Sequence, residues 1–460
     1  KTARATFVLE TSNHNTIRNN SAENFYIKLE GSGHNRIENN RENAPEEDSE
    51  IKIINGSSHN AVVNNTVDRI RTFGGTDFLI SSNNVKDINI LGTDSLVIIA
   101  NTIQNGYTGV DVSMSNQLLI EDNIITECRN GIKLSSARNA DVYRNHIHHN
   151  DEWGIEIDQS EHVEVKRNNR ITHNGVGGLW MFNSQHILIR DNRVKYHDVE
   201  QEDTERYKHS ALGFYMMWCK DVNIIGNIIQ HNCTSFYVEG SQRINIGLNT
   251  ESESLCLFTG VHAVSSEIDI YGNTIEQNNG AGIMAEQAST LNVWQNNITD
   301  NDIFGVMNDD QASTVIADNN WWGKAEGPGQ DDVTGFVQAD AWLSEPVTLA
   351  AMADADTFAI PVGSSDSCVI NAINLKNPSE PITFDWVDKS GYAANTGPVQ
   401  ATGDSTSASA SVTLAIPANA VIGQSGWVVY TATLQSDPGT TVTDSFFVMP
   451  YGPELAFISL

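Results

Sequence analysis

Two carboxylates that lie two residues apart are the first groups in this sequence that could do chemistry. Glu156 and Asp158 belong to the alternating segment Gly154-Ile155-Glu156-Ile157-Asp158, which predicts a β-strand with both carboxylates on one face. Such a pair could act as acid and base, or as acid and nucleophile, in glycoside hydrolysis. Lys133 occupies the position of Glu156 in a preceding segment. It could neutralise a uronate carboxyl group or act as the base of a β-elimination.

Aromatic side chains take the same strand positions further along the chain. Flat rings stack on the C–H faces of sugars, while charged groups hydrogen-bond sugar hydroxyls. The sequence therefore predicts a glycan groove whose binding residues include Asp111, Trp180, Phe182, Tyr215 and Tyr237. Two alternatives stay open. Aromatic residues simply favour strands, and Asp111, Lys133 and Glu156 would also form a row of charges that satisfy one another.

An insertion before Tyr215 could form one wall of this groove. Residues 198–212 interrupt the repeat with about twelve extra residues, and long loops on compact scaffolds often carry function. We expect Tyr207 to contact substrate and His209 to move protons. The alternative is a solvated acidic bulge.

The elements that position these residues come from a repeat. Asn-x-Ile/Val followed by a further Asn recurs every ~22–24 residues, with copies that begin at Asn15, Asn35, Asn60, Asn101, Asn123, Asn145, Asn169, Asn192, Asn227, Asn273 and Asn296. Each later unit also carries Gly-apolar-x-apolar, as in Gly109-Val110-Asp111-Val112. Short strands with no room for a helix must stack on neighbouring repeats. This predicts a right-handed parallel β-helix of about fourteen coils, roughly 65 Å long, with asparagine ladders at left-handed turns.

The motif set resembles the secreted right-handed β-helix proteins with PbH1-type repeats. The resemblance covers roughly residues 1–340, including the ending Asn320-Trp321-Trp322-Gly323. It implies the fold strongly, and function only as a range: polysaccharide lyases, glycoside hydrolases, alginate epimerases, phage tailspikes, adhesins and copper-site maturation proteins. Alginate C5-epimerases carry Tyr-Gly-Phe-Asp-Pro-His, whereas Trp153-Gly154-Ile155-Glu156-Ile157-Asp158 lacks the Tyr, the Pro and the His. That departure argues against epimerase chemistry.

The composition changes after Glu345. Residues 346–460 contain no Arg and no His, and short alternating runs separated by turn signals replace the Asn repeat. We expect an all-β chain with two domains: the β-helix over 1–345, and over 346–460 an accessory β-sandwich of immunoglobulin or fibronectin type.

Charge excludes several classes of partner. The chain has 58 acidic and 27 basic residues, for a net charge of −31, which argues against nucleic acid and anionic membrane surfaces. Residues 129–208 are nearly neutral, with 12 basic and 13 acidic residues, so an anionic glycan would be tolerated there. No apolar stretch is long enough to span a bilayer, and no leader is evident at Lys1. The five cysteines have no zinc-type spacing.

These observations favour a secreted or cell-surface protein that binds a polysaccharide along the central coils. The favoured version is a lyase, a glycoside hydrolase or an epimerase; the alternative is a non-catalytic adhesin or structural rod of an extracellular assembly. Homo-oligomers are compatible with exposed flat faces. We expect no cofactor, although acidic patches could bind calcium. His149 and His173 should be neighbours, but a metal would need a third, converging ligand.

Overall fold

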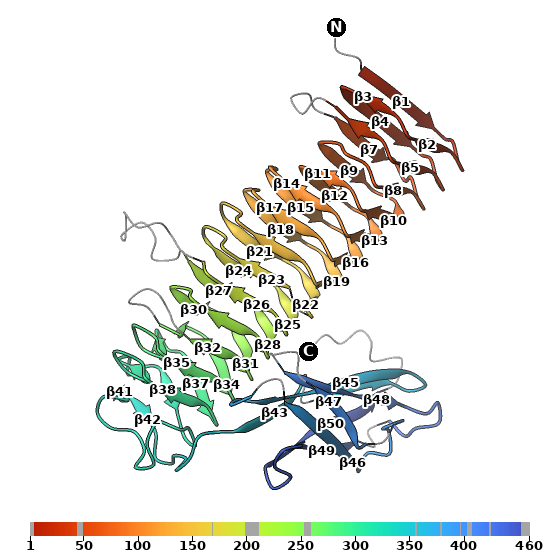
Figure 1. Ribbon diagram of the computed structural model, residues 1–460. Coiled ribbons are helices and arrows are strands. Elements are labelled where there is room, and N and C mark those ends of the chain that lie inside the picture. Colours follow the sequence, from red (N-terminus) through yellow and green to blue (C-terminus); the bar gives the residue numbers. More distant parts are fainter. Residues whose placement is uncertain are drawn as a thin grey trace.

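The computed structural model describes residues 4–451, except 44–48, 168, 198–210, 253–258, 355–356, 378–379, 396, 403–406 and 423–424. All regular elements in this part of the chain are β-strands. Three long parallel sheets form a rod, and a smaller β-region lies beside its C-terminal end (Figure 1). No helix among the described residues has the length and apolarity that a membrane crossing requires.

Sheet A and sheet B each contain fifteen strands, one from every coil. The strands of sheet A are β1 (Arg4–Glu10), β4 (Asn24–Glu30), β7 (Glu50–Ile54), β9 (Arg69–Phe73), β12 (Asp87–Leu91), β15 (Thr108–Ser113), β18 (Asn130–Ser135), β21 (Trp153–Asp158), β24 (Gly177–Phe182), β27 (Leu212–Met217), β30 (Thr234–Glu239), β33 (Val261–Val264), β36 (Ile283–Glu286), β39 (Val306–Asn308) and β41 (Val333–Gly335). The strands of sheet B are β2 (Thr16–Arg18), β5 (Arg36–Glu38), β8 (Ala61–Val63), β10 (Thr76–Ser81), β13 (Asp94–Ile99), β16 (Asn116–Glu121), β19 (Arg138–Tyr143), β22 (Glu161–Lys166), β25 (Gln185–Arg190), β28 (Lys220–Ile225), β31 (Gln242–Gly247), β34 (Glu267–Tyr271), β37 (Thr290–Trp294), β40 (Thr314–Ile316) and β42 (Val337–Gln338).

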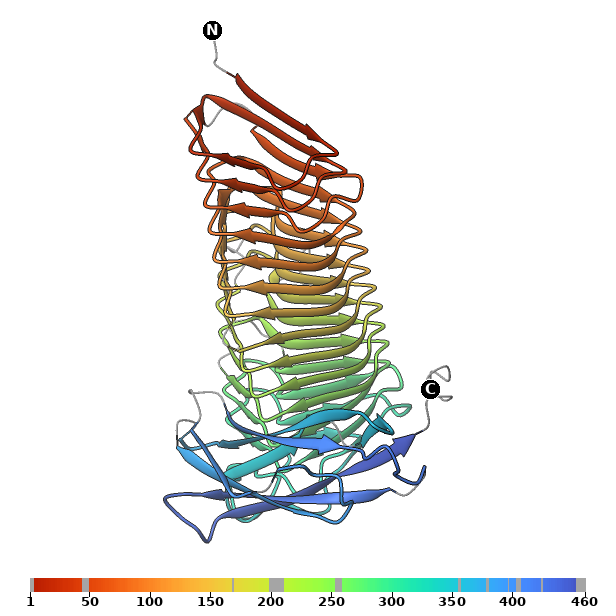
Figure 2. The same ribbon diagram turned by 90° about the vertical axis from the view of Figure 1, so that its right-hand side faces the viewer.

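Sheet C is shorter and closes the third side of the rod. Its strands are β11 (Asn84–Val85), β14 (Thr102–Gln104), β17 (Ile124–Thr126), β20 (His146–His148), β23 (Arg170–Thr172), β26 (Arg193–Lys195), β29 (Ile228–Gln230), β32 (Thr250–Ser252), β35 (Thr274–Glu276) and β38 (Asn297–Thr299). A separate pair, β3 (Ser21–Ala22) and β6 (Arg41–Glu42), occupies this side in the first coils. Figure 2 shows the coils stacked along one axis. The predicted β-helix is thus confirmed.

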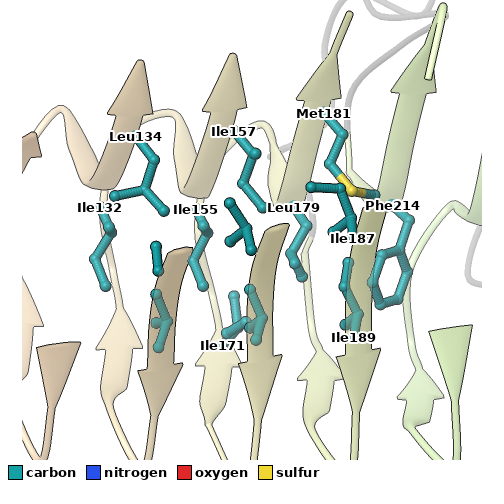
Figure 3. Packing of buried hydrophobic residues seen from close by; sticks show 14 of the residues in the cluster. Ile132, Leu134, Ile155, Ile157, Ile171, Leu179, Met181, Ile187, Ile189 and Phe214 are labelled. Atoms are coloured by element: carbon teal, nitrogen blue, oxygen red, sulfur yellow. The ribbon is translucent and has the colours of Figure 1, made fainter. Parts of the chain in front are cut away.

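The interior of the rod is a set of aliphatic columns. Because strand residues alternate in direction, the first and third residues after each glycine point inward. Ile132, Ile155, Leu179 and Phe214 therefore follow one another on successive coils, each fully buried (Figure 3). Burying one such side chain contributes about 1.5–3 kcal/mol, so the columns are the main stabilising feature of the rod.

The predicted asparagine ladder is present, with two corrections. It runs from Asn20 to Asn320 at the turn between sheets B and C, each side-chain amide donating to the next Asn. The left-handed backbone lies one residue earlier than predicted, as at Arg144 (φ 55°) before Asn145. Asn145 itself is not in the left-handed backbone region. Its side chain instead hydrogen-bonds the backbone of a neighbouring coil.

The second correction concerns the register of the first repeats. Asn15, Asn35 and Asn60 lie at the turn between sheets A and B, where they form a short ladder of their own. Copies from Asn101 onward begin instead at the turn between sheets B and C. The same six-letter motif therefore marks two different corners, which is why the spacing of 41 residues after Asn60 is irregular.

The C-terminal region consists of two sheets around one core. One sheet contains β43 (Leu349–Ala353), β45 (Ser365–Asn374) and β48 (Ala408–Ala415); the other contains β44 (Thr357–Pro361), β50 (Thr441–Tyr451), β49 (Gly426–Leu434), β46 (Pro381–Asp388) and β47 (Val399–Thr402). Ile370 from the first sheet and Phe384 and Tyr430 from the second share the apolar core. β44 pairs parallel with β50 and the remaining pairs are antiparallel. The immunoglobulin-type fold and the boundary at 345/346 stay predictions.

This region docks on the outer face of sheet B. Val347, Ala350 and Ile373 pack against Ile225 and Leu248 of the rod. Polar contacts reinforce the apolar ones: Asn223 Nδ2 donates to the Asp354 carbonyl at 3.0 Å, Tyr271 Oη to the Ala351 carbonyl at 3.2 Å, and Ser407 Oγ to Asp191 Oδ1 at 2.6 Å. The C-terminal region therefore contacts several successive coils.

Candidate functional site

The residues predicted from the repeat form one column on the outer face of sheet A. Strand register aligns Asp111, Lys133, Glu156, Trp180, Tyr215 and Tyr237 on six successive strands, from β15 to β30. A parallel column places Asp158 beside Phe182. We call the outer surface of these six strands face A. The register follows from the inward aliphatic columns, because a slip of one residue would bury the charges.

Lys133 and Glu156 form an ion pair at the centre of the charged half of face A. Lys133 Nζ lies 2.8 Å from Glu156 Oε2, with the Glu156 side chain only 7% exposed and the Lys133 side chain 35% exposed. Burial lowers the pKa of Lys133, but the hydrogen bond to Glu156 and the charges of Glu156, Asp111 and Asp158 outweigh it. The net pKa lies above the ordinary value, so this amine stays protonated. That disfavours the predicted role of Lys133 as a base.

Two carboxylates flank this pair. Burial raises the pKa of Asp111 above its ordinary value, although Lys133 and the Ser113 hydroxyl oppose the shift. Asp158 has one buried carboxylate oxygen, Oδ1, with no hydrogen-bond partner among the described residues. A buried acceptor without a donor is costly, while the Asp158 side chain as a whole is partly exposed on face A.

The aromatic half of face A is a continuous set of half-buried rings. Trp180 and Phe182 lie nearly parallel, with ring centroids 5.7 Å apart and planes 14° apart. Tyr215 and Tyr237 meet edge to face at 5.2 Å. Burial, with the nearby Glu239 and Tyr237, raises the pKa of Tyr215 to about 12. The phenol therefore stays protonated and can donate a hydrogen bond.

Three further residues belong to this surface and were not predicted from the sequence. Trp153 lies 6.3 Å from the Tyr215 ring, and Trp218 lies 5.2 Å from Phe182 and is 56% exposed. His262 continues the column after Tyr237, with Nε2 3.3 Å from Glu286 Oε2. His262 could have been read from the column. Trp153 and Trp218 lie at strand ends, where the period-two pattern gives no signal.

The predicted loop residues Tyr207 and His209 lie outside the described residues. The loop hypothesis therefore stays a prediction.

A separate column of rings follows the turns beside sheet C. His149, His173, Tyr196 and His231 stack in order, with neighbouring centroids 4.7–5.1 Å apart. Each has a positive φ between 53° and 60°. The prediction that His149 and His173 are neighbours is confirmed. Over the described ranges, no three His, Cys, Asp or Glu side chains converge in a way that could hold a metal ion.

Cysteine chemistry bears on the compartment. Cys233 is disulfide-bonded, whereas Cys128, Cys219 and Cys368 are free and buried. Burial raises the pKa of the Cys128 and Cys219 thiols to about 11, so these thiols are unreactive packing groups. A disulfide is typical of oxidising environments outside the cytosol.

Comparison with known families agrees with this architecture. Residues 74–200 match the family model described as right handed beta helix region, and residues 193–326 match the model described as periplasmic copper-binding protein (NosD). With the three parallel sheets and the asparagine ladder, these matches define the class: the chain is a right-handed β-helix protein. No match is found among curated proteins.

Solved structures with similar chain paths include three polysaccharide-related proteins. The periplasmic alginate epimerase AlgG has 10% identity and a TM-score of 0.38, over 60% of this chain and 76% of its own. The A-module of a mannuronan C-5 epimerase from Azotobacter vinelandii has 12% identity and a TM-score of 0.33, over 74% and 90%. An alginate lyase from Paenibacillus has 12% identity and a TM-score of 0.21, over 71% and 99%. Likeness at this level says nothing of the reaction.

Proposed function

We propose that face A binds a polysaccharide chain and that its charged half cleaves or modifies that chain, as a lyase, a glycoside hydrolase or an epimerase does. The observation that carries the proposal is the row of flat rings, Trp180 to Tyr237, in the same strand column as Asp111, Lys133 and Glu156. Neighbouring strands lie about 4.8 Å apart. The six strands therefore span roughly 24 Å, enough for several sugar units in an extended chain.

The side chains support particular roles. Lys133, held protonated, would neutralise the carboxyl group of a uronic acid unit and would not itself remove a proton. Asp111, whose pKa burial raises, is the group suited to donate a proton, whereas Tyr215, whose pKa is raised to about 12, is suited to donate a hydrogen bond. Asp158, with its unpartnered carboxylate oxygen, would accept a hydroxyl hydrogen bond or act as base. Tyr207 and His209 would complete the site from the loop.

The Cys233 disulfide and the strongly acidic surface support a secreted or cell-surface protein. Within the same proposal the C-terminal region is an immunoglobulin-like accessory domain. Calcium binding and a homo-oligomer remain compatible additions.

A second candidate is a non-catalytic adhesin or structural rod. The ion pair favours it, because Lys133 and Glu156 already satisfy each other as a structural charge row would. In this version the rings bind glycan and no bond is broken.

One experiment separates these candidates. Incubate the protein with neutral and uronic polysaccharides, and record reducing ends and the absorbance of unsaturated products. The enzyme proposal expects turnover that Glu156→Ala and Lys133→Ala abolish. Trp180→Ala and Tyr215→Ala should each weaken glycan affinity about three- to tenfold, because a ring contact contributes about 0.5–1.5 kcal/mol.

Phe73→Ala is the matched control. Phe73 lies in the same strand column as Phe182, but on a coil outside face A. It should leave affinity unchanged. Binding without turnover on every substrate would leave the adhesin version. Unchanged binding in both Trp180→Ala and Tyr215→Ala would overturn face A itself.

A further inference from the structure

A large cleft lies on the other side of the rod from the proposed reaction site. Its floor is the outer face of sheet B between β19 and β31, and Ala359 on β44 of the C-terminal region forms part of the opposite wall. Its volume is about 1240 Å³, whereas other cavities along the rod measure about 300–400 Å³. Ligand pockets in proteins commonly measure about 300–1,000 Å³. This cleft is therefore large enough for an oligosaccharide.

The two walls are held in a fixed relation to each other. Asn223 belongs to the floor, and its amide donates to the Asp354 carbonyl at 3.0 Å, a few residues before the opposite wall. The apolar contact of Ile225 with the C-terminal region adjoins it. The cleft is thus a built feature of the docked region and does not depend on a swinging linker.

The floor presents hydrogen-bonding groups in two rows that follow the rod axis. The first row contains left-handed residues at one corner, and the second contains the outward residues of the strands, interrupted by the apolar Leu188. In order they are Asn139, His162, His186, Asp221 and Arg243, then Asp141, Glu164, Leu188, Asn223 and Asn245. His162 and His186 are stacked, with centroids 4.9 Å apart and planes 9° apart. The two rings cover each other's faces, so a ligand beside them meets mainly ring edges.

Most of the charges that line the floor are paired, although Lys220, which also lines it, forms no ion pair within the described part of the chain. Arg243 binds Asp221 through two hydrogen bonds, Nε to Oδ1 at 2.5 Å and Nη2 to Oδ2 at 2.7 Å. Lys166 Nζ lies 2.9 Å from Asp141 Oδ1 and also contacts Glu164. Because most cations there are already paired with carboxylates, a polyanion would meet mainly negative or neutralised groups. This disfavours uronic chains as ligands of the cleft. An apolar ligand would have to desolvate these groups without replacing their hydrogen bonds.

We propose that this cleft is a second carbohydrate site, separate from face A, which takes a short neutral oligosaccharide. Sugar hydroxyls both donate and accept hydrogen bonds, so they match amides and ion-paired carboxylates whose remaining donor and acceptor positions face the cleft. Neighbouring strands of the floor lie about 4.8 Å apart, a spacing comparable to the length of one sugar unit. The imidazole nitrogens can add a donor or an acceptor for sugar hydroxyls. The proposal stands independently of the reaction proposed for face A.

Calorimetric titration of the full protein tests this site. The probes are hexasaccharides of β-1,4-linked glucose, xylose, mannose and N-acetylglucosamine, with an alginate hexasaccharide as the anionic comparison. We expect at least one neutral probe to bind. The double variant His186→Ala/Asn245→Ala should raise its Kd at least tenfold. Ala359→Trp, a substitution at an exposed strand position that fills the cleft from the other wall, should abolish binding.

Two controls locate the binding. His34→Ala removes a member of the stacked row His14, His34 and His59, which lies on coils far from the cleft, and should change nothing. Trp180→Ala alters face A and should leave the neutral probe's affinity unchanged. Thermal unfolding of each variant verifies the fold.

Three results would overturn the second site: no neutral probe binds, binding survives both cleft variants, or Trp180→Ala alone removes it. The last result would assign the probe to face A and so support the first proposal while refuting this one. Loss of alginate binding in the cleft variants would refute the neutral class of ligand.

Discussion

At the residue scale, the Lys133–Glu156 pair has a measurable effect on stability. Lys133→Ala leaves the Glu156 carboxylate buried without its cation, which should lower the free energy of unfolding by about 1–3 kcal/mol. This loss in the free energy of unfolding is smaller than for a fully buried pair, because Lys133 is about one third exposed. Urea unfolding measures the change.

Lys28→Ala is the control, because Lys28 pairs with Glu30 in a setting where both side chains are considerably more exposed than Glu156. Its cost should be clearly smaller than that of Lys133→Ala, because solvent screens an exposed pair. Equal losses in the two variants would show that Glu156 gains nothing from its partner.

A second residue-scale prediction concerns Glu251, a carboxyl group inside the rod. It takes the place of Ile229 and Ile275 in the inward column of sheet C, and it is fully buried, with contacts to Ser235 Oγ at 2.9 Å and Asn278 Nδ2 at 3.0 Å. Burial raises its pKa from 4.5 to about 8. The folded state therefore holds a proton that the unfolded state releases above about pH 4.5.

The direction of the pH dependence follows from this raised pKa. Stability falls as pH rises from about 4.5 to about 8, by up to about 1.4 kcal/mol per pH unit, and levels off above that window. Glu251→Gln should remove this contribution and raise the melting temperature at pH 8 more than at pH 5. A shift of the same size at both pH values would contradict the assignment.

At the element scale, the asparagine ladder connects the turns of successive coils. Asn145 Nδ2 donates to the carbonyls of Ile120 and Tyr143 and to Asn169 Oδ1, at 2.9–3.1 Å. Asn145→Ala would leave buried carbonyls without donors, so we expect a loss of about 3 kcal/mol in chemical unfolding. Arg138→Ala, at an exposed position of the same coil with ordinary backbone geometry, should cost less than about 0.5 kcal/mol. Similar costs for the two would disprove the ladder's contribution.

This scale also shows what could be predicted from sequence. The period-two alternation fixes which residues face out, so the column from Asp111 to Tyr237 could be placed from the repeat alone. The repeat alone does not separate the first three motif copies, at Asn15, Asn35 and Asn60, from the later ones, because Asn suits both turns equally. The position of Trp218 depends on Gly240, where any Cβ would come within 2.4 Å of the indole. No pattern in the sequence predicts such a contact.

At the scale of the whole molecule, the docking of the C-terminal region was beyond sequence reasoning. Its hydrogen bonds join residues such as Asn223 and Asp354, which are 131 positions apart and share no periodicity. Gly272 is essential to the fit, because a Cβ there would lie 2.7 Å from the Cβ of Ala350 on β43.

Gly272→Val should therefore displace β43 from sheet B and leave the rod intact. Small-angle X-ray scattering should show a larger radius of gyration, and limited proteolysis should separate the C-terminal region faster than in the unaltered protein. Gly56→Val is the control: its turn has open space around the added atom, and it should leave the docking unchanged. An unaltered scattering profile in Gly272→Val would contradict this role of Gly272 at the interface.

The docked region changes how such a rod should come apart. In a solenoid each coil contacts only its neighbours, so opening can begin anywhere and spread one coil at a time. Here Asp191, Asn223, Tyr271 and Asn297 all hold one folded unit, so the coils between them must be released together. Amide exchange should thus be graded along the first coils and cooperative in the last ones. The first coils would therefore open one at a time, whereas the coils bound to the C-terminal region would open only together.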